Sequence, residues 1–534
     1  MRTSERVRSS RFSAGSSDLI SLTTTGRVAH RAPATSATGA AAKIVILIWI
    51  FAVAARLISI NQPYIDHWSW RQSDVAAIAR NYSENGFRFA YPQIDWAGDA
   101  PGYVGTEFPI LPFIAAICYK IAGTHEWIGR IQAVILFAVS LLFFFLLVRE
   151  IFGSTAAVWA TFFYSFAPLN VFAGRSFMPD VPSLSLAIVG LYFFLWWSRD
   201  HHWTPLLLAA IAISLSFLIK ITSIIILAPL VYLAVAGAGG PGFLASLIDG
   251  RDHRSRLQLA LIAVIALLSS AFWYWHAHQI AERFYPHHFF GAGGIQIEHF
   301  SWYLHIAQQT LISSLTPVLS LMALIGIFVA PRSRYSRLFH WWLVAMVIFM
   351  IMVGYGNRHL WYQLPLVPIA AGFAGVACAF LGSKISSRVV VVTFSILLVG
   401  SFAFLALRYV QPFYQSSAAQ LRNAGLALNK VTAADALIVA ADMGDPTIFY
   451  YAQRKGWHFL ENDAIYNGNP DDSEQAIENL ERLRRRGATH FVFTRNTFWW
   501  LQSYPELVGH LSKHATLIEA TPEFRIYRLD TAVR

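Results

Sequence analysis

The sequence has few charged residues, because only 13% of its 534 residues are Asp, Glu, Lys or Arg. A soluble domain usually carries about 25%. The deficit comes from long stretches that contain none of these four residue types. These stretches are 131–148, 153–174, 221–248, 306–331, 359–383 and 389–407. Several of them reach the roughly 18–20 residues that cross a bilayer as a helix. The sequence therefore excludes an ordinary soluble globular protein and predicts a polytopic α-helical membrane protein.

Cysteine is also scarce, with only Cys118 and Cys378, both in apolar segments. A disulfide framework is therefore not expected. Negative charge is in short supply too, and the net charge is +11. The basic residues fall mainly in short loops and in the N-terminal tail, as the positive-inside rule for membrane proteins requires. We therefore expect contact with membrane lipid and no nucleic-acid partner.

The N-terminal segment 1–42 is rich in Ser, Thr, Ala and Arg and has no apolar periodicity. This composition predicts a disordered cytoplasmic tail, with a cleaved targeting peptide as the alternative. The first apolar run, 43–60, begins too far from the N-terminus for an ordinary signal peptide. We expect it to be a retained membrane anchor.

Starting with this tail inside, the charge rule gives about 11 transmembrane helices. They are expected at 43–60, 130–148, 154–173, 181–197, 204–219, 222–238, 257–275, 307–330, 340–355, 363–382 and 389–407. The loops 61–129 and 174–180 then lie outside, and the basic loop 239–256 lies inside. The apolar segment 108–122 is placed as a partly embedded surface helix, because a full span there would put the later basic loops outside.

After residue 410 the composition changes, and 415–534 is expected to form a small extracytoplasmic α/β domain. Strands are predicted at 436–442 and 523–529, and a capped helix ends near Gly487. Asp442 and Asp445 follow a predicted strand, where α/β sheets often place binding sites. We prefer the interpretation that they form a turn in an accessory domain.

The stretch YIDHWSWRQSDVA (64–76) concentrates charge at the mouth of the first span. Charged groups near a bilayer are costly unless they have partners or a function. Each residue has a structural interpretation: Asp66 caps the following helix, and Arg71 pairs with Asp74 at i, i+3. The tryptophans are then interfacial anchors.

The predicted outer side also gathers charge from other, distant loops. Carboxylates lie in three loops, and cations lie at two further outer positions. These residues are Asp66, Asp74, Glu107, Asp180, Lys220, Arg358 and His359. A general base needs a carboxylate against the acceptor, and a phosphate leaving group needs cationic donors around it. Both requirements fit a transferase that uses a lipid-phosphate donor.

Several motifs in the same order strengthen this prediction. They are the charged stretch after the first span, FPILPF, RSFMPDVPSLSLAIVGLYFF, FLIKITSIIILAPL and HLWYQLPLVPIAAG. Over about residues 43–410 this order resembles the multi-spanning GT-C glycosyltransferases, and most closely the bacterial glycosyltransferase 39 group. That group is similar to the protein O-mannosyltransferases and to the lipid A aminoarabinose transferase.

The resemblance implies a GT-C-like transmembrane domain (43–410) that transfers a sugar from a polyprenyl-phosphate donor to an extracytoplasmic acceptor, with inversion. The acceptor class stays open among protein, lipid and glycan. The resemblance also implies that an acidic residue of the first outer loop is the base. It implies no cofactor or metal, and the expected location is the bacterial inner membrane.

The family's Asp-Glu pair falls near Arg71 and Gln72 of this chain, so the base is open between Asp66 and Asp74. Asp66 is favoured, because it lies where the chain leaves the membrane. By resemblance, the other site residues bind substrate. They are Arg71, Glu107, Asp180, Lys220, Arg358, His359 and Tyr362, with the donor phosphate near Lys220 and Arg358.

Three alternatives stay open. A transporter would explain the spans, but it predicts ionisable residues in mid-membrane and internal repeats, and we see few of the former and no clear repeat. A non-catalytic scaffold that binds lipid-linked sugars would use the same residues. Histidines in loop 276–305 could form a metal site, although their spacing favours interfacial histidines.

Overall fold

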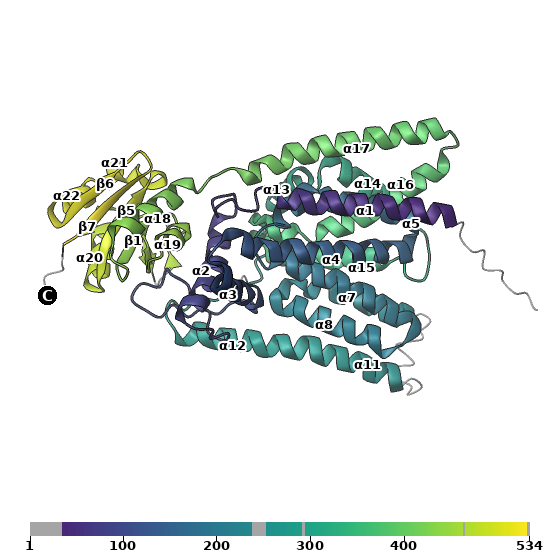
Figure 1. The fold of residues 1–534 in the computed structure, drawn as a ribbon, viewed down its shortest axis with the longest axis horizontal. Coiled ribbons are helices and arrows are strands. Elements are labelled where there is room, and N and C mark those ends of the chain that lie inside the picture. Colours follow the sequence, from purple (N-terminus) through teal and green to yellow (C-terminus); the bar gives the residue numbers. More distant parts are fainter. Residues whose placement is uncertain (1–34, 238–252, 291–293, 463–464, 531–534) are drawn as a thin grey trace, which may run out of the picture.

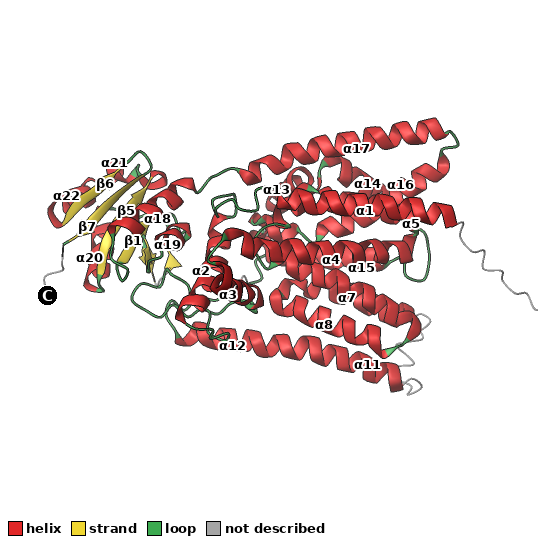
Figure 2. Ribbon diagram, viewed as in Figure 1, coloured by secondary structure: helices red, strands yellow, loops and turns green. Residues whose placement is uncertain are grey.

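The computed structural model describes residues 35–237, 253–290, 294–462 and 465–530. Most of the predicted tail 1–42 and of the predicted inner loop 239–256 lies outside the described residues. The described chain forms a long helical bundle and a smaller body of strands and helices (Figure 2). Loops and two surface helices lie between the two parts (Figure 1).

The helices of the bundle follow the uncharged stretches of the sequence. In chain order they are α1 (Thr35–Leu57), α4 (Glu126–Phe152), α5 (Ser154–Phe166), α6 (Pro168–Ala173), α7 (Asp180–Asp200), α8 (Trp203–Ile219), α9 (Leu227–Gly237), α11 (His253–Ala263), α12 (Ser269–Arg283), α13 (Phe300–Gln309), α14 (Pro317–Val329), α15 (Leu338–Val353), α16 (Leu366–Lys384) and α17 (Arg388–Val410). Short 3-10 and π segments join or extend them: η1 (Ile221–Ile226), η2 (Val264–Leu268), η3 (Thr310–Leu315), η4 (Gly354–Arg358), η5 (Leu360–Gln363) and η6 (Gln411–Tyr414).

Within the described ranges, six helices are long and apolar enough to cross a membrane, or seven if one bent pair is a single span. Three further apolar helices are shorter, at Ile110–Ala122, Trp203–Ile219 and Ile221–Gly237. The chain is thus a multi-pass membrane protein, and the count of about 11 spans stays a prediction.

Two predicted spans are broken at prolines, which corrects the expectation of continuous helices. The span 154–173 divides into α5 and α6, because Ala167 precedes Pro168 and takes an extended ψ of 133°. The span 307–330 bends by 105° between Phe300–Leu315 and Pro317–Val329. In both places the proline ring disfavours helical backbone at the preceding residue.

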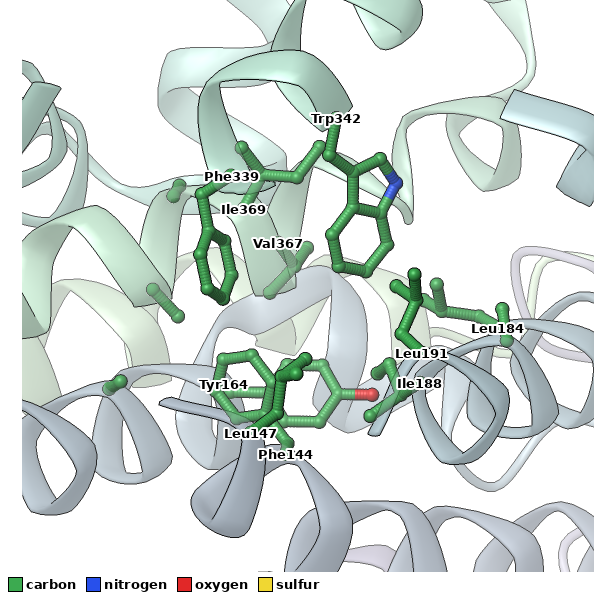
Figure 3. Close-up of a cluster of buried hydrophobic side chains, with 14 of the residues drawn as sticks. Phe144, Leu147, Tyr164, Leu184, Ile188, Leu191, Phe339, Trp342, Val367 and Ile369 are labelled. Atoms are coloured by element: carbon green, nitrogen blue, oxygen red, sulfur yellow. The ribbon is translucent and has the colours of Figure 1, made fainter. Parts of the chain in front are cut away.

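Buried aromatic and aliphatic side chains fill the bundle interior, and Figure 3 shows one such cluster. It joins side chains of α4, α5, α7, α15 and α16. Its labelled members are Phe144, Leu147, Tyr164, Leu184, Ile188, Leu191, Phe339, Trp342, Val367 and Ile369. Because lipid is as apolar as these side chains, the helices associate through close packing rather than through the exclusion of water.

Two helices of the first loop lie at the end of the bundle that faces the C-terminal domain (Figure 1). They are α2 (Ser69–Asn85) and α3 (Ile110–Ala122). With 13 residues, α3 is too short to span a bilayer, in agreement with the predicted surface helix. Helix α2 is polar, yet 14 of its 17 residues are buried. Buried polar side chains require partners, so α2 is where a site is expected.

The C-terminal part is an α/β domain with a five-stranded sheet of order β2-β1-β5-β7-β6. Its strands are β1 (Leu437–Ala441), β2 (Gly456–His458), β5 (Ala488–Thr494), β6 (Ala515–Ala520) and β7 (Phe524–Leu529), and β3 (Glu461–Asn462) pairs with β4 (Ile465–Tyr466). Its helices are α18 (Ala419–Val431), α19 (Thr447–Ala452), α20 (Ser473–Arg485), α21 (Trp500–Ser503) and α22 (Pro505–His514).

The sheet has a core on each face. Helices α18 and α19 pack on one face, and α20 and α22 pack on the other. The predicted helix before Gly487 is α20, and the side chain of Asp472 caps it by accepting from Gln475 N–H at 2.8 Å. Strand β1 is parallel to both β2 and β5, so the carboxyl ends of β1 and β2 lie at one edge of the sheet.

Candidate functional site

Arg71 and Glu107 form the first part of the site, from α2 and the loop before α3. Arg71 Nη2 donates to both oxygens of Glu107, at 2.7 and 2.9 Å. The Thr106 hydroxyl also donates to Glu107, at 2.9 Å. Burial alone would raise the pKa of Glu107, but Arg71 and Lys220 hold it below its usual value. The expected Arg71–Asp74 ion pair is therefore replaced by an ion pair with Glu107, in which one guanidinium nitrogen contacts both carboxylate oxygens.

Lys220 and Asp180 form the second part, where two neighbouring helices meet. Asp180 is the first residue of α7, and Lys220 directly follows α8. A carboxylate at a helix N-terminus and a cation at a helix C-terminus both complement the helix dipole. Lys220 Nζ lies 2.7 Å from Asp180 Oδ1 and 5.4 Å from the ring centre of Tyr362. Asp180 Oδ2 is buried and has no hydrogen-bond partner among the described residues.

His359 and Arg358 lie between α15 and α16. The His359 ring stacks on Trp361 with ring centres 4.4 Å apart, and Trp70 of α2 contacts both rings. The exposed Arg358 lies over the ring of Tyr355 at 4.1 Å. Among the described residues it makes no ion pair, so its charge is available to an anion.

An apolar groove lies between segments that neighbour these cations in the chain. Residues of η1 and the start of α9 line one wall, and residues of α15 line the other. The wall residues include Ile224, Leu227, Trp341, Ile348 and Met352. Since η1 begins directly after Lys220 and α15 ends shortly before Arg358, each wall belongs to a segment with a cation near one end.

Asp66 lies elsewhere, in a buried ion cluster of its own. Arg130 and Arg175 both donate to its Oδ2, at 3.1 and 3.0 Å. Gln72 Nε2 donates to its Oδ1 at 2.7 Å, and the Trp68 N–H donates to Oδ1 at 3.2 Å. Both carboxylate oxygens are thus occupied, and the side chain is 1% exposed. This does not support the preference for Asp66 as the base, because a base needs a free lone pair toward the acceptor.

Asp74 differs from the other three predicted outer carboxylates, because it has no ion pair among the described residues. Its Oδ1 accepts from the indole N–H of Trp96 at 2.9 Å. Burial raises the pKa of Asp74 to about 7, although Trp96, Arg71 and His458 act in the opposite direction. A carboxyl that titrates near neutral pH, next to a cluster of charged groups, is typical of functional sites.

Three residues of the C-terminal domain complete the surroundings of Asp74. His458 Nδ1 lies 2.9 Å from both oxygens of Asp442, and both side chains are buried. The ring of Trp96 lies 5.3 Å from that of His458. Asp445 accepts from the Ser69 hydroxyl at 2.7 Å. Asp442 and Asp445 do lie in a turn after β1, as expected. This turn is more than accessory, because Asp445 contacts Ser69 of α2.

The structure thus brings together Arg71, Glu107, Asp180, Lys220 and Tyr362, with His359 beside them. Sequence reasoning missed the cationic partners of Asp66 and the aromatic and histidine neighbours of Asp74. The missed residues are Arg130, Arg175, Trp96 and His458. One signal was present for the arginines, because each lies on the predicted outer side, where basic residues are scarce.

The expected loop 276–305 is partly helical, because α12 continues to Arg283 and α13 begins at Phe300. Several of its histidines serve as hydrogen-bond and ring partners. His276 contacts the carbonyl oxygen of Ala90 at 3.0 Å, and His287 contacts that of Ala281 at 3.1 Å. His288 packs against Trp96. Across the described ranges, no group of three or more His, Cys, Asp or Glu residues is arranged to hold a metal ion.

Part of this chain matches the sequence model of a known protein family. The sequence model of the family described as dolichyl-phosphate-mannose-protein mannosyltransferase matches residues 101–275. This segment contains Glu107, Asp180 and Lys220. No curated protein sequence matches the chain significantly.

Solved structures match almost the whole chain. Apo ArnT from Cupriavidus metallidurans has a TM-score of 0.62 at 15% identity, covering 92% of this chain and 98% of ArnT. The same protein bound to undecaprenyl phosphate has a TM-score of 0.59 at 14% identity, with the same coverage. AglB, the archaeal oligosaccharyltransferase from Archaeoglobus fulgidus, in complex with an inhibitory peptide and a dolichol-phosphate, has a TM-score of 0.56 at 13% identity. That match covers 94% of this chain and 75% of AglB.

At these identities the similarity shows the fold. The motif-based resemblance is confirmed: the chain is a multi-pass membrane protein with the GT-C glycosyltransferase fold, similar to the protein mannosyltransferases.

Proposed function

We propose that this protein is a glycosyltransferase that moves a sugar from a polyprenyl-phosphate donor to an extracytoplasmic acceptor. The observation that carries the proposal is the buried cluster of Arg71, Glu107, Asp180 and Lys220. It joins α2, the loop before α3 and the α7–α8 end beside an apolar groove. A charged head and an apolar tail are the two parts of a lipid-phosphate donor. Two proteins of similar fold have been solved with such lipids, undecaprenyl phosphate and dolichol-phosphate.

The donor phosphate would lie at the end of the groove, against Arg358 and Lys220. Arg358 is free of carboxylates among the described residues, and Lys220 has Asp180 as its partner. The isoprenoid tail would follow the groove between η1 and α15. Cations fixed around a phosphate stabilise the charge that develops as it leaves.

The sugar hydroxyls would meet the carboxylates of the cluster. Asp180 Oδ2 is a buried acceptor with no hydrogen-bond partner among the described residues, and such an atom is costly unless a ligand satisfies it. Glu107 is held by Arg71 and Thr106, so its orientation is fixed. His359 and Tyr362 lie beside Lys220 and would border the sugar.

Asp74 is our candidate for the general base, in place of Asp66. The acceptor hydroxyl would replace the indole N–H of Trp96 at Asp74 and transfer its proton to the carboxylate. The acceptor oxygen would form a bond to the anomeric carbon on the face opposite the phosphate. The bond from that carbon to the phosphate oxygen would break, and polyprenyl phosphate would leave with the electron pair, which inverts the anomeric configuration.

The test is mass spectrometry of cell-envelope glycans in a deletion strain complemented with wild type, Asp74→Asn or Asp66→Asn, at matched membrane expression. We expect Asp74→Asn to leave the missing sugar unrestored. Asp66→Asn should restore it in proportion to the amount of folded protein. If Asp74→Asn restores the wild-type profile, Asp74 is not the base. If even the wild-type gene changes no glycan in the deletion strain, a transporter or a non-catalytic scaffold becomes the better proposal.

A matched control is available at the other end of the bundle. Asp200 also accepts from an indole N–H, that of Trp196 at 2.8 Å, but it is exposed. Asp200→Asn makes the same chemical change at a hydrogen bond of the same kind. It should restore the glycan fully.

A further inference from the structure

The C-terminal domain presents a buried ion pair directly to the surroundings of Asp74. Asp442 follows β1, and His458 ends β2, which is parallel to β1. The parallel pairing therefore brings the two side chains to the same edge of the sheet, where Nδ1 of His458 lies 2.9 Å from Asp442. Asp442 is 1% exposed and His458 is 3% exposed. A buried pair of this kind is held in place by its low-dielectric surroundings.

Trp96 connects this pair to α2. Its indole N–H donates to Asp74, and its ring lies against His458 on one side and His288 on another. The loop that carries Trp96 is itself fixed to the C-terminal domain. Gly98 N–H donates to the carbonyl of Gly456 at 2.7 Å, and Gly456 N–H donates to that of Asp95 at 3.0 Å.

Further hydrogen bonds join α2 to α19 and to the residues just before it. Ser69 donates to Asp445 at 2.7 Å, and the hydroxyls of Ser73 and Thr447 lie 3.0 Å apart. Arg80 donates to the carbonyl of Tyr450 at 2.6 Å. Asp74 is thus enclosed by α2, the loop of Trp96 and the C-terminal domain.

We propose that the C-terminal domain completes the site, because its Asp442–His458 pair, placed against Asp74 through Trp96, offsets part of the cost of ionising Asp74 for proton abstraction. This inference rests on the proposed role of Asp74. It makes His458 and Asp442 positioning residues, since they act through Asp74 and do not touch the substrate.

The charges around the cluster agree with this role. Trp96 of the first loop, Arg71 of α2 and His458 of the C-terminal domain favour the ionised form of Asp74, whereas Asp445 of the C-terminal domain opposes it. Burial alone would lower the pKa of His458, but Asp442, with Asp74 and Asp445, holds it above its usual value. The imidazolium therefore persists to higher pH and offsets part of the cost of an ionised Asp74.

The experiment measures the protonation of Asp74 without any substrate. Purified full-length protein is treated with dicyclohexylcarbodiimide, which reacts with protonated carboxyls, over a range of pH. Peptide mass spectrometry gives the modified fraction of Asp74. The proteins compared are wild type, His458→Gln, Asp442→Asn and the control His510→Gln, each shown to be monodisperse by gel filtration.

We expect the midpoint of Asp74 modification to rise by about one pH unit or more in His458→Gln, because an opposite charge nearby is removed. Asp442→Asn should move it in the same direction, since the imidazole loses the partner that keeps it charged. His510 pairs with Glu481 at 2.7 Å in α22 and α20, away from α2 (Figure 1), so His510→Gln should leave the midpoint unchanged. If Asp442→Asn and His458→Gln titrate like wild type, or if the modification does not depend on pH, the proposal is wrong.

Glycan transfer separates this inference from the proposed function. If the midpoints shift while Asp74→Asn still restores the glycan, the electrostatic link stands and the base role is wrong. If Asp74→Asn abolishes transfer while the midpoints do not move, the base role stands and the link is wrong.

Discussion

The two aspartates of the first loop differ in their partners more than in their positions. They are eight residues apart, and both are buried. Asp66 accepts from two arginines, whereas Asp74 accepts from one neutral indole. The oxygens of Asp66 are occupied by these arginines and by Gln72, which fits a structural role. A carboxylate without a cationic partner keeps a higher proton affinity, as a base requires.

Asp66→Asn should therefore lower the free energy of unfolding strongly, whereas the rate of transfer per folded molecule should change little. The substitution leaves Arg130 and Arg175 buried next to each other, and breaking such a pair costs about 3–5 kcal/mol. We expect a clear fall of the thermal midpoint in detergent, measured by tryptophan fluorescence. Transfer divided by the amount of folded protein should stay within a few-fold of wild type. A wild-type midpoint would contradict the structural role of this cluster.

The pH dependence of transfer should report Asp74. Its folded-state pKa of about 7 lies above the usual value, so the carboxyl is protonated below about pH 7 and cannot accept a proton. We expect transfer to fall about tenfold per pH unit well below that value. The same shift means that the native state keeps this proton to a higher pH than the unfolded chain. Asp74 therefore lowers the free energy of unfolding as pH rises from about 4 to 7. The measurement is the initial rate of transfer against pH in membrane vesicles. A rate that does not change from pH 5 to 8 would contradict the role of Asp74 as the base.

At the scale of elements, α2 is a polar helix fixed by contacts on several sides. Arg80 donates to Asp95 at 2.5 Å and to the carbonyl of Tyr450, and Asn81 also donates to Asp95 at 3.0 Å. These bonds join α2, the first loop and α19. Sequence reasoning assigned the charges of this region to local i, i+3 pairing, because pairs within a helix are the ones visible in a sequence.

Arg80→Gln should loosen this junction. It leaves Asp95 buried without its cation, so we expect a loss of about 3–5 kcal/mol, seen as a lower thermal midpoint and as faster proteolysis between the bundle and the C-terminal domain. Arg199→Gln is the matched control, because Arg199 pairs with Glu150 at an exposed site. Exposed pairs contribute about 0–1 kcal/mol, so the control should resemble wild type. Equal effects of the two substitutions would contradict the junction.

At the scale of the whole molecule, the candidate site and the C-terminal domain lie at the same end of the bundle. The predicted topology puts the loop of α2 and the C-terminal domain on the outer side, and the structure places them together at one end of the bundle (Figure 1). A donor sugar and an acceptor could then meet in a compartment separate from the cytoplasm.

Cysteine labelling can test this orientation. In a background where Cys118 and Cys378 are replaced, we expect a membrane-impermeant maleimide to label Lys513→Cys in intact cells and to leave Lys384→Cys unlabelled. Both lysines are exposed in the structure, one in the C-terminal domain and one at the end of α16. After the cells are permeabilised, both variants should be labelled. Labelling of Lys384→Cys alone in intact cells would reverse the proposed topology.

The sequence by itself determined that the chain has many apolar helices and is a multi-pass membrane protein. Uncharged runs and apolar strand patterns are local properties. They predicted bundle helices, a short helix within 108–122 and strands at 436–442 and 523–529, and the structure has α3 at 110–122, β1 at 437–441 and β7 at 524–529. The order of the motifs also led to the GT-C fold.

Only the tertiary structure decided which charge meets which. Glu107 is 36 residues from Arg71, and Arg175 is 109 residues from Asp66. His458 approaches Asp74 from another domain, through a sheet register that no local pattern encodes. The protonation and role of a carboxyl depend on its burial and on the charges within a few ångströms. Those neighbours are set by packing across the fold, which explains why the sequence favoured Asp66, an aspartate that the structure holds between two arginines.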